Sequence, residues 1–196
     1  MVDATLPLRK TPPNPKTRRM YPVLRTLLEA RSAAKLPRLP IDGTHVSHHT
    51  CMPWDIDAYM ELNNGRTLTL LDIGRTGLAI RTGLVGLLRA NRWGLTMAGA
   101  SVRYRRRIRP FNRFEVRSTA LGYDARFMYL HQSIWRKGEA ACSVLYRSAV
   151  VSKSGMVPTA EVLAALGEHD WRPTLPDWVQ NWIQAEDTRP WPPAHP

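Results

Sequence analysis

The chain has 196 residues and a mass of 22.3 kDa, which suits one domain with a hydrophobic core and is too short for two of ordinary size. Its composition, 43% hydrophobic and 22% charged, excludes a largely disordered protein. The net charge of +12 favours anionic partners such as phosphorylated ligands, nucleic acid or anionic membranes. No apolar run approaches the roughly 20 residues needed to span a bilayer. Two unpatterned cysteines and the lack of a secretory signal predict a cytoplasmic protein.

The N-terminal part divides into two segments. Residues 1–19 are rich in proline and basic residues and predict a tail that does not bury enough apolar surface to order itself. Residues 20–43 predict a short helix followed by a linker, and we expect this helix to pack on the domain rather than lie on a membrane. The apolar residues at helical spacing are Val23, Leu24, Leu27 and Leu28.

The next segment, residues 44–54, is β-branched and aromatic enough for a strand. His45 and His49 share one face of this strand and could bind a metal. No third ligand follows at a useful spacing, so we interpret them as half-exposed strand histidines and predict no metal site.

A long helix is predicted over residues 66–84, about five turns, capped by Asn63 or Asn64. Gly74 and Gly77 lie on or near its apolar side, which predicts a very close approach to other backbone. The apolar ladder consists of Leu70, Ile73, Gly77, Ile80 and Leu84.

The remainder changes to a period of two and predicts four strands in an antiparallel meander, then a helix over residues 158–166. The Trp- and Pro-rich extension 168–196 is expected to pack as a clasp. One long helix beside a run of strands predicts an α+β architecture, in which an antiparallel sheet wraps a long central helix. The predicted strands cover residues 99–108, 113–122, 127–138 and 140–151.

Several motifs together resemble the hotdog-fold acyl-CoA thioesterases, and within them the thioesterase-like branch of the 4-hydroxybenzoyl-CoA thioesterase group. The motifs are WDIDAYMELNNG, LLDIGR, YRRRIRPFNRFEV and GYDARFMYLHQSIW. The resemblance covers roughly residues 44–167, which it identifies as a hotdog domain. It implies an acyl-CoA substrate, no metal or other cofactor, and a homodimer or homotetramer with active sites at the subunit interface.

The resemblance also assigns the second Asp of the motif, Asp57, as the catalytic carboxylate. Hydrolysis of a thioester needs a nucleophile or general base, plus donors where negative charge develops on the carbonyl oxygen. Asp57 would supply the first, and the N–H groups of Asn64 and Gly65 at the helix start would supply the second. The alternative for Asp57 is a turn aspartate in an Asx-turn.

Glu61 stands where the family commonly has His, and it either raises the pKa of Asp57 or pairs with Arg66. For Asp72 the alternative to a substrate role is an ion pair with Arg75 or with an arginine of a strand. For the arginines it is a solvated strand face. The substrate-binding candidates are Asn63, Tyr59, Asp72, Arg105 and Arg107.

Two other functions compete with acyl-CoA hydrolysis. A non-catalytic acyl-CoA or lipid-binding hotdog protein is motivated by Glu61 in place of His. A nucleic-acid binder is motivated by the charge and by RYRRRIR at residues 103–109, where Tyr104 could stack on a base. Since no known nucleic-acid-binding module is recognisable, we do not expect a nucleic-acid partner.

Overall fold

The computed structural model describes residues 22–193, so the tail predicted at residues 1–19 lies outside the described part. The described chain forms an antiparallel sheet of six strands, ordered β1-β3-β4-β5-β2, with β6 paired to the end of β5. The strands are β1 (His45–Thr50), β2 (Gly94–Tyr104), β3 (Arg113–Tyr123), β4 (Met128–Arg136), β5 (Glu139–Ser152) and β6 (Gly155–Val157). The helices are α1 (Val23–Ala33), a 3-10 turn η2 (Pro53–Asp55), α2 (Asn64–Arg81), α3 (Leu84–Asn91), α4 (Thr159–Leu166) and α5 (Asp177–Asp187).

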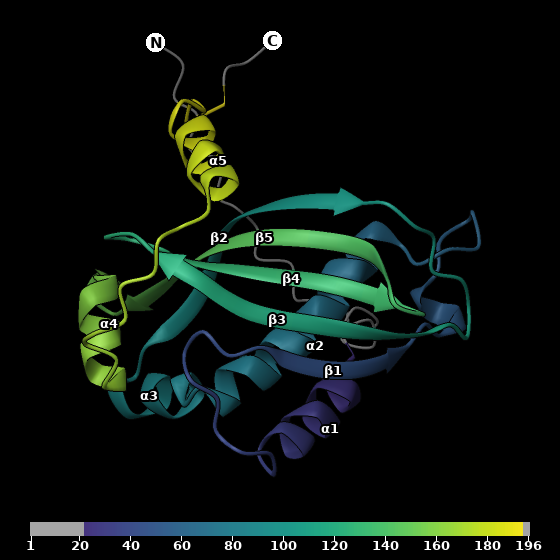
Figure 1. Cartoon of the computed structure of the whole chain (residues 1–196), viewed down its shortest axis with the longest axis horizontal. Helices are drawn as coiled ribbons and strands as arrows, with labels where there is room; N and C mark the ends of the chain where they lie inside the picture. Colours follow the sequence, from purple (N-terminus) through teal and green to yellow (C-terminus); the bar gives the residue numbers. More distant parts are fainter. Residues whose placement is uncertain (1–21, 194–196) are drawn as a thin grey trace, which may run out of the picture.

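Helix α2 lies across one face of the sheet (Figure 1) and forms the centre of the core. Leu70, Leu71 and Ile73 are fully buried there against the inward side chains of β3, β4 and β5. Strand β3 alternates buried and half-buried residues along its length, because successive side chains of a strand point to opposite faces. The predicted α+β architecture, an antiparallel sheet wrapped around a long helix, is confirmed.

The predicted helix over residues 66–84 is wrong in its extent. Gly83 adopts a φ of 85°, a left-handed conformation that ends the helical path, and α3 starts directly after it. Leu84, the last residue of the predicted ladder, therefore belongs to α3. Neither α3 nor the first five residues of β2 were predicted.

The predicted meander is also wrong for its first strand. β3, β4 and β5 are neighbours in sequence order, but β2 pairs with β5 at one edge, and β1 pairs with β3 at the other. The alternation of a strand in sequence specifies which of its faces is buried, and it does not specify which strand lies beside it.

The close approach predicted at the α2 glycines is present, but the neighbours are side chains rather than backbone. A Cβ atom on Gly74 would lie 2.6 Å from Cγ1 of Val116, and one on Gly77 would lie 2.2 Å from Nε2 of His45. Real Cβ atoms do not come this close to other atoms. The two glycines therefore let α2 sit directly on β1 and β3.

Helix α1 packs on α2, as predicted, but not through the apolar stripe that predicted the helix. Its buried side is polar or small: Arg25 binds Asp55 at 2.8 Å, Glu29 binds His45 at 2.8 Å, and Ala33 is buried. The exposed fractions on the opposite side are 53% for Val23, 69% for Leu24, 56% for Leu27 and 59% for Leu28.

His45 and His49 are buried, which corrects the expectation that they are half-exposed. Both face inward from β1 beneath the helices. His45 binds Glu29 of α1, and His49 binds the hydroxyl of Ser47 at 2.8 Å. Burial lowers the pKa of His49 to about 4, so its ring is neutral at pH 7.

The C-terminal extension returns to the sheet on the face opposite α2 (Figure 1). Val179 of α5 is fully buried against Tyr129 and Leu145, with Trp182 and Ile183 beside it. The outer face of β4 and β5 is thereby covered.

Candidate active site

The loop between η2 and α2 folds into a tight turn that carries Asp57. Ile56 and Leu62 form an isolated antiparallel bridge, and the N–H of Asp57 donates to the carbonyl of Glu61 at 2.9 Å. Met60 closes the turn with a φ of 58°, which is uncommon for a residue with a side chain. Such local strain is often found at functional sites.

The Asp57 side chain is half-buried, and its Oδ1 accepts the N–H of Tyr59 at 2.8 Å. This is the Asx-turn that the sequence offered as the alternative role. Within residues 22–193 no hydrogen bond reaches Oδ2, so the second carboxylate oxygen stays available. The Asx-turn therefore orients the carboxylate without consuming both of its oxygens.

Asn63 caps the start of α2, as predicted. Its Oδ1 accepts the N–H of Arg66 at 3.1 Å, and its carbonyl accepts the N–H of Thr67 at 2.8 Å. In the described chain, the N–H groups of Asn64 and Gly65 have no hydrogen-bond partner. An α-helix begins with unpaired N–H groups and a positive dipole end, so these two donors can stabilise a developing oxyanion.

The buried carboxylate of the motif is Asp55, not Asp57. Asp55 is 1% exposed, and it accepts from Arg25 at 2.8 Å and from the N–H of Met52 at 3.0 Å. Its other oxygen lies 3.2 Å from Nε of Arg66. Asp55 thus joins α1, the loop and α2. Sequence reasoning did not identify Arg25 as its partner, because nothing local links residues 30 positions apart.

A cavity of about 220 Å³ opens beside the start of α2. It brings Glu61 and Asn64, which are neighbours at the start of α2, together with the predicted Arg105 and Arg107, which lie more than 40 positions later in the sequence. The lining residues are Glu61, Leu62, Asn64, Thr67, Tyr104, Arg105, Arg106, Arg107, Ile108, Ile134, Ala141 and Cys142.

A second cavity, of about 310 Å³, shares the arginine wall. Arg136 and Glu139, at the turn between β4 and β5, complete it. Glu61 binds Arg107, with Oε2 and Nε 2.9 Å apart, whereas Arg66, the partner offered as one of two alternatives for Glu61, pairs with Asp55. Four guanidinium groups around a common hollow favour a phosphorylated ligand, because each can bind phosphate in a bidentate manner.

Five candidates are not among the residues that line these cavities: Asp57, Tyr59, Asn63, Gly65 and Asp72. The turn connects Asp57 directly to Glu61. Tyr59 is 81% exposed. Asp72 lies farther along α2 and forms an ion pair with Arg75. Burial raises the pKa of Asp72, and the Arg75 guanidinium opposes this shift.

Cys142 was not predicted to be a site residue, yet it lies on the floor of the first cavity. Burial raises the pKa of its thiol to about 11, so the thiolate that would be needed for nucleophilic attack is scarce at pH 7. Cys142 therefore contributes apolar surface to the wall of this cavity and does not act as a nucleophile.

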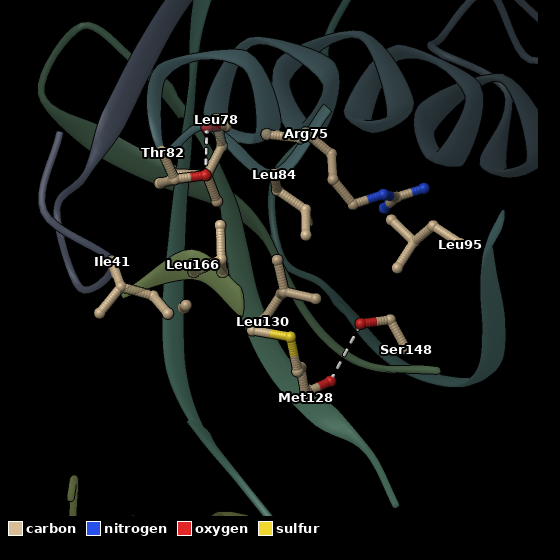
Figure 2. Close-up of a pocket in the computed structure, with 12 residues that line it drawn as sticks. Ile41, Arg75, Leu78, Thr82, Leu84, Leu95, Met128, Leu130, Ser148 and Leu166 are labelled. Carbon is tan, nitrogen blue, oxygen red and sulfur yellow. Dashed lines mark hydrogen bonds between the residues drawn. The ribbon is translucent and has the colours of Figure 1, made fainter. Parts of the chain in front are cut away.

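A further pocket lies at the other end of α2, between that helix, β4 and α4 (Figure 2). Leucine, isoleucine and methionine side chains dominate its walls, and Arg75, Thr82 and Ser148 are its polar lining residues. It encloses about 30 Å³, which is room for little more than one water molecule. In this form of the molecule it does not hold an acyl chain.

Comparison with known proteins identifies the class. The family model of the thioesterase-like superfamily matches residues 51–183. The chain therefore belongs to the thioesterase-like superfamily. The predicted hotdog fold is confirmed, and membership supports a thioesterase-type function.

Individual relatives agree with this assignment. Protein THEM6 of Drosophila melanogaster is 28% identical over 148 residues, which cover 74% of this chain and 75% of that protein. The structure of YbaW, a probable thioesterase from Escherichia coli, matches with a TM-score of 0.59 at 16% identity, over 64% of this chain and 98% of that one. The SAV2348 protein from Staphylococcus aureus, solved in complex with CoA, matches with a TM-score of 0.57 at 12% identity, over 71% of this chain and 92% of that one.

Among the described helices, none is both long and apolar enough to cross a membrane.

Proposed function

We propose that this protein hydrolyses acyl or aryl thioesters of coenzyme A to the free acid and coenzyme A. The observation that carries the proposal is the arginine-walled cavity at the start of α2, which is lined by Asn64, the first residue of the helix, and by Arg105, Arg106 and Arg107. Superfamily membership and the CoA complex of SAV2348 support the same substrate class.

In the proposed reaction the thioester carbonyl oxygen points at the N–H groups of Asn64 and Gly65. Asp57 acts as a general base for water, or attacks the carbonyl carbon itself, and the tetrahedral oxyanion is stabilised by the helix start. The C–S bond then breaks and the CoA thiolate leaves. In the general-base route the thiolate takes up the proton that Asp57 removed from water. In the nucleophile route water hydrolyses the acyl–Asp57 anhydride to the free acid, regenerates the carboxylate and supplies the proton for the thiolate. Asn63 positions the helix start by capping it.

The phosphates of CoA would bind in the hollow that is walled by Arg105, Arg106 and Arg107, with Arg136 at its far side. Tyr104 donates its hydroxyl to the carbonyl of Asn64 at 3.3 Å and so connects the arginine segment to the helix start. Glu61 holds Arg107 in this arrangement.

The proposed assembly is a homodimer. Strand β2 is an edge strand of 11 residues with β5 on one side only, and a long open edge is a template for pairing with a second chain. The candidate cavity begins at Tyr104, the last residue of β2, so a copy paired along this edge would flank the site. Sedimentation velocity on the purified protein tests this assembly. A cytoplasmic location stays a prediction.

The deciding experiment measures CoA release from a panel of acyl- and aryl-CoA substrates with wild type and the Asp57→Ala variant. We expect turnover by wild type and a loss of about a hundredfold or more in the variant, as for removal of a general base. Asp72→Ala is the matched control, because its carboxylate lies farther along α2 and is paired with Arg75. Equal turnover by Asp57→Ala and wild type would refute the role of Asp57.

A second candidate function is non-catalytic binding of acyl-CoA. It is favoured by Glu61, which stands where the family commonly has His and is held in an ion pair with Arg107. Calorimetric titration with a non-hydrolysable acyl-CoA thioether distinguishes the two, since binding without any hydrolysis of the matching thioester supports this second function.

A further inference from the structure

The outward face of α1 is an apolar strip with no partner in the described structure. Val23, Leu24, Leu27 and Leu28 are each more than half exposed, and together they occupy one side of the first two turns. Such a row on a helix normally faces a core. Here the core-facing side is already occupied by Arg25, Glu29 and Ala33.

The charges around this strip have one sign. Arg31 continues the same side one turn after Leu27, and Lys35 follows, both of them exposed. Glu29 is the single acid of α1, and it is held by His45 on the inward side.

Strand order shows what a dimer would leave uncovered. Helix α1 lies beside β1, at the edge of the sheet opposite β2. Pairing of two copies along β2, as proposed above, would place their α1 helices at the far ends of the combined sheet. The apolar strip would stay exposed on both copies.

We propose that the outward face of α1 binds the surface of anionic phospholipid bilayers, with its leucines inserted at the level of the headgroups and its basic flanks on the lipid phosphates. An apolar strip bordered by Lys and Arg is the arrangement by which interfacial helices bind such membranes without spanning them. An uncharged apolar partner would gain nothing from the exposed basic residues Arg31 and Lys35 beside the strip, whereas an anionic membrane would. This binding site is independent of the catalytic proposal.

Vesicle co-sedimentation of the full chain tests the proposal directly. We expect binding to phosphatidylcholine vesicles that contain phosphatidylglycerol, and at least about tenfold weaker binding to phosphatidylcholine alone, because each basic residue near the surface contributes attraction. The double variant Leu24→Ser/Leu27→Ser should weaken binding to anionic vesicles at least about tenfold. Val46→Ser, an exposed apolar residue on β1, is the matched control and should bind as wild type does.

A site-specific probe separates insertion from other ways of covering this face. Cys51 and Cys142 are buried, so a polarity-sensitive dye on Leu28→Cys would label one exposed position. The expected result is a blue shift of dye emission on addition of anionic vesicles, with none for the same dye on Lys153→Cys. A dye at position 28 that is already blue-shifted without vesicles would mean that protein covers this face, and would overturn the proposal. Equal binding of wild type and the double variant would also overturn it.

Discussion

Helices α1 and α2 lie side by side, and both carry leucines at helical spacing, yet they bury opposite kinds of side chain (Figure 1). In α2 the leucines and isoleucine face the apolar side of the sheet. In α1 they face solvent, and Arg25 and Glu29 face inward. The difference arises from what each helix meets, because the surface offered to α1 contains the buried carboxylate of Asp55 and the ring of His45. Buried polar groups are costly unless they are paired, so they select the polar side of α1.

The largest effect on the free energy of unfolding is expected when one leucine from each helix is replaced and the two variants are compared. Leu70→Ala in α2 removes a fully buried side chain and should lower the free energy of unfolding by about 2–5 kcal/mol. Leu24→Ala in α1 should change it by less than about 0.5 kcal/mol, because the side chain is 69% exposed. Urea unfolding followed by circular dichroism measures both. A loss of several kcal/mol for Leu24→Ala would show that the α1 stripe is packed in solution.

The next comparison concerns the two aspartates of the DID motif. Asp55→Ala removes the buried carboxylate that joins Arg25 of α1 to Arg66 of α2 and should lower the free energy of unfolding by about 3 kcal/mol, because both of these ion pairs are lost. Asp57→Ala should cost less than about 1 kcal/mol while it abolishes the proposed activity. Thermal melts and the CoA-release assay on both variants would reveal whether stability and activity separate in this way.

A third prediction concerns the pH dependence of folding stability that is caused by His49, which is buried beneath α1. Burial lowers the pKa of His49 to about 4, below the ordinary value of 6.5, so the unfolded chain takes up a proton at a pH where the folded chain does not. Stability should therefore fall as the pH drops from 6.5 toward 4, by about 2 kcal/mol between pH 7 and pH 5 from this residue. His49→Gln should remove that part of the dependence. Identical pH profiles for wild type and variant would show that His49 is not responsible.

The smallest effect compares two glycines in neighbouring helices. Gly77→Ala in α2 would place a Cβ 2.2 Å from the His45 ring and 2.8 Å from Glu29 of α1, and should destabilise by about 1–3 kcal/mol through overpacking. Gly86→Ala in α3 meets no atom within 4 Å and should stabilise by about 0.5–1 kcal/mol through helix propensity. Melting temperatures that move in the same direction for both variants would contradict the close contact at Gly77.

Much of the fold could be predicted because local patterns report burial. The periods of α2, β3, β4 and β5 identified those elements, and the Asn63 cap followed from the side-chain chemistry of helix starts. The end of α2 could not be predicted from its ladder, since Gly83 redirects the chain while the apolar period continues into α3. The pairing of β2 with β5 could not be predicted either, because strand pairing depends on the arrangement of the whole sheet.

The candidate site shows the same division. The resemblance pointed to Asp57, and the unpaired N–H groups of a helix start pointed to Asn64 and Gly65, all within one continuous motif. The arginine wall, the Glu61–Arg107 pair and the Asp55–Arg25 pair join segments far apart in the chain.

By itself, the sequence determined α2 and the strands β3, β4 and β5, the buried side of α2, and the motif that begins α2, because these depend on the spacing of neighbouring residues. Only the tertiary structure decided which side of α1 faces inward and which arginines surround the helix start. Those outcomes depend on the groups that other elements present at each contact, and buried Asp55 and His45 outweigh the apolar pattern of α1 in choosing its partner face.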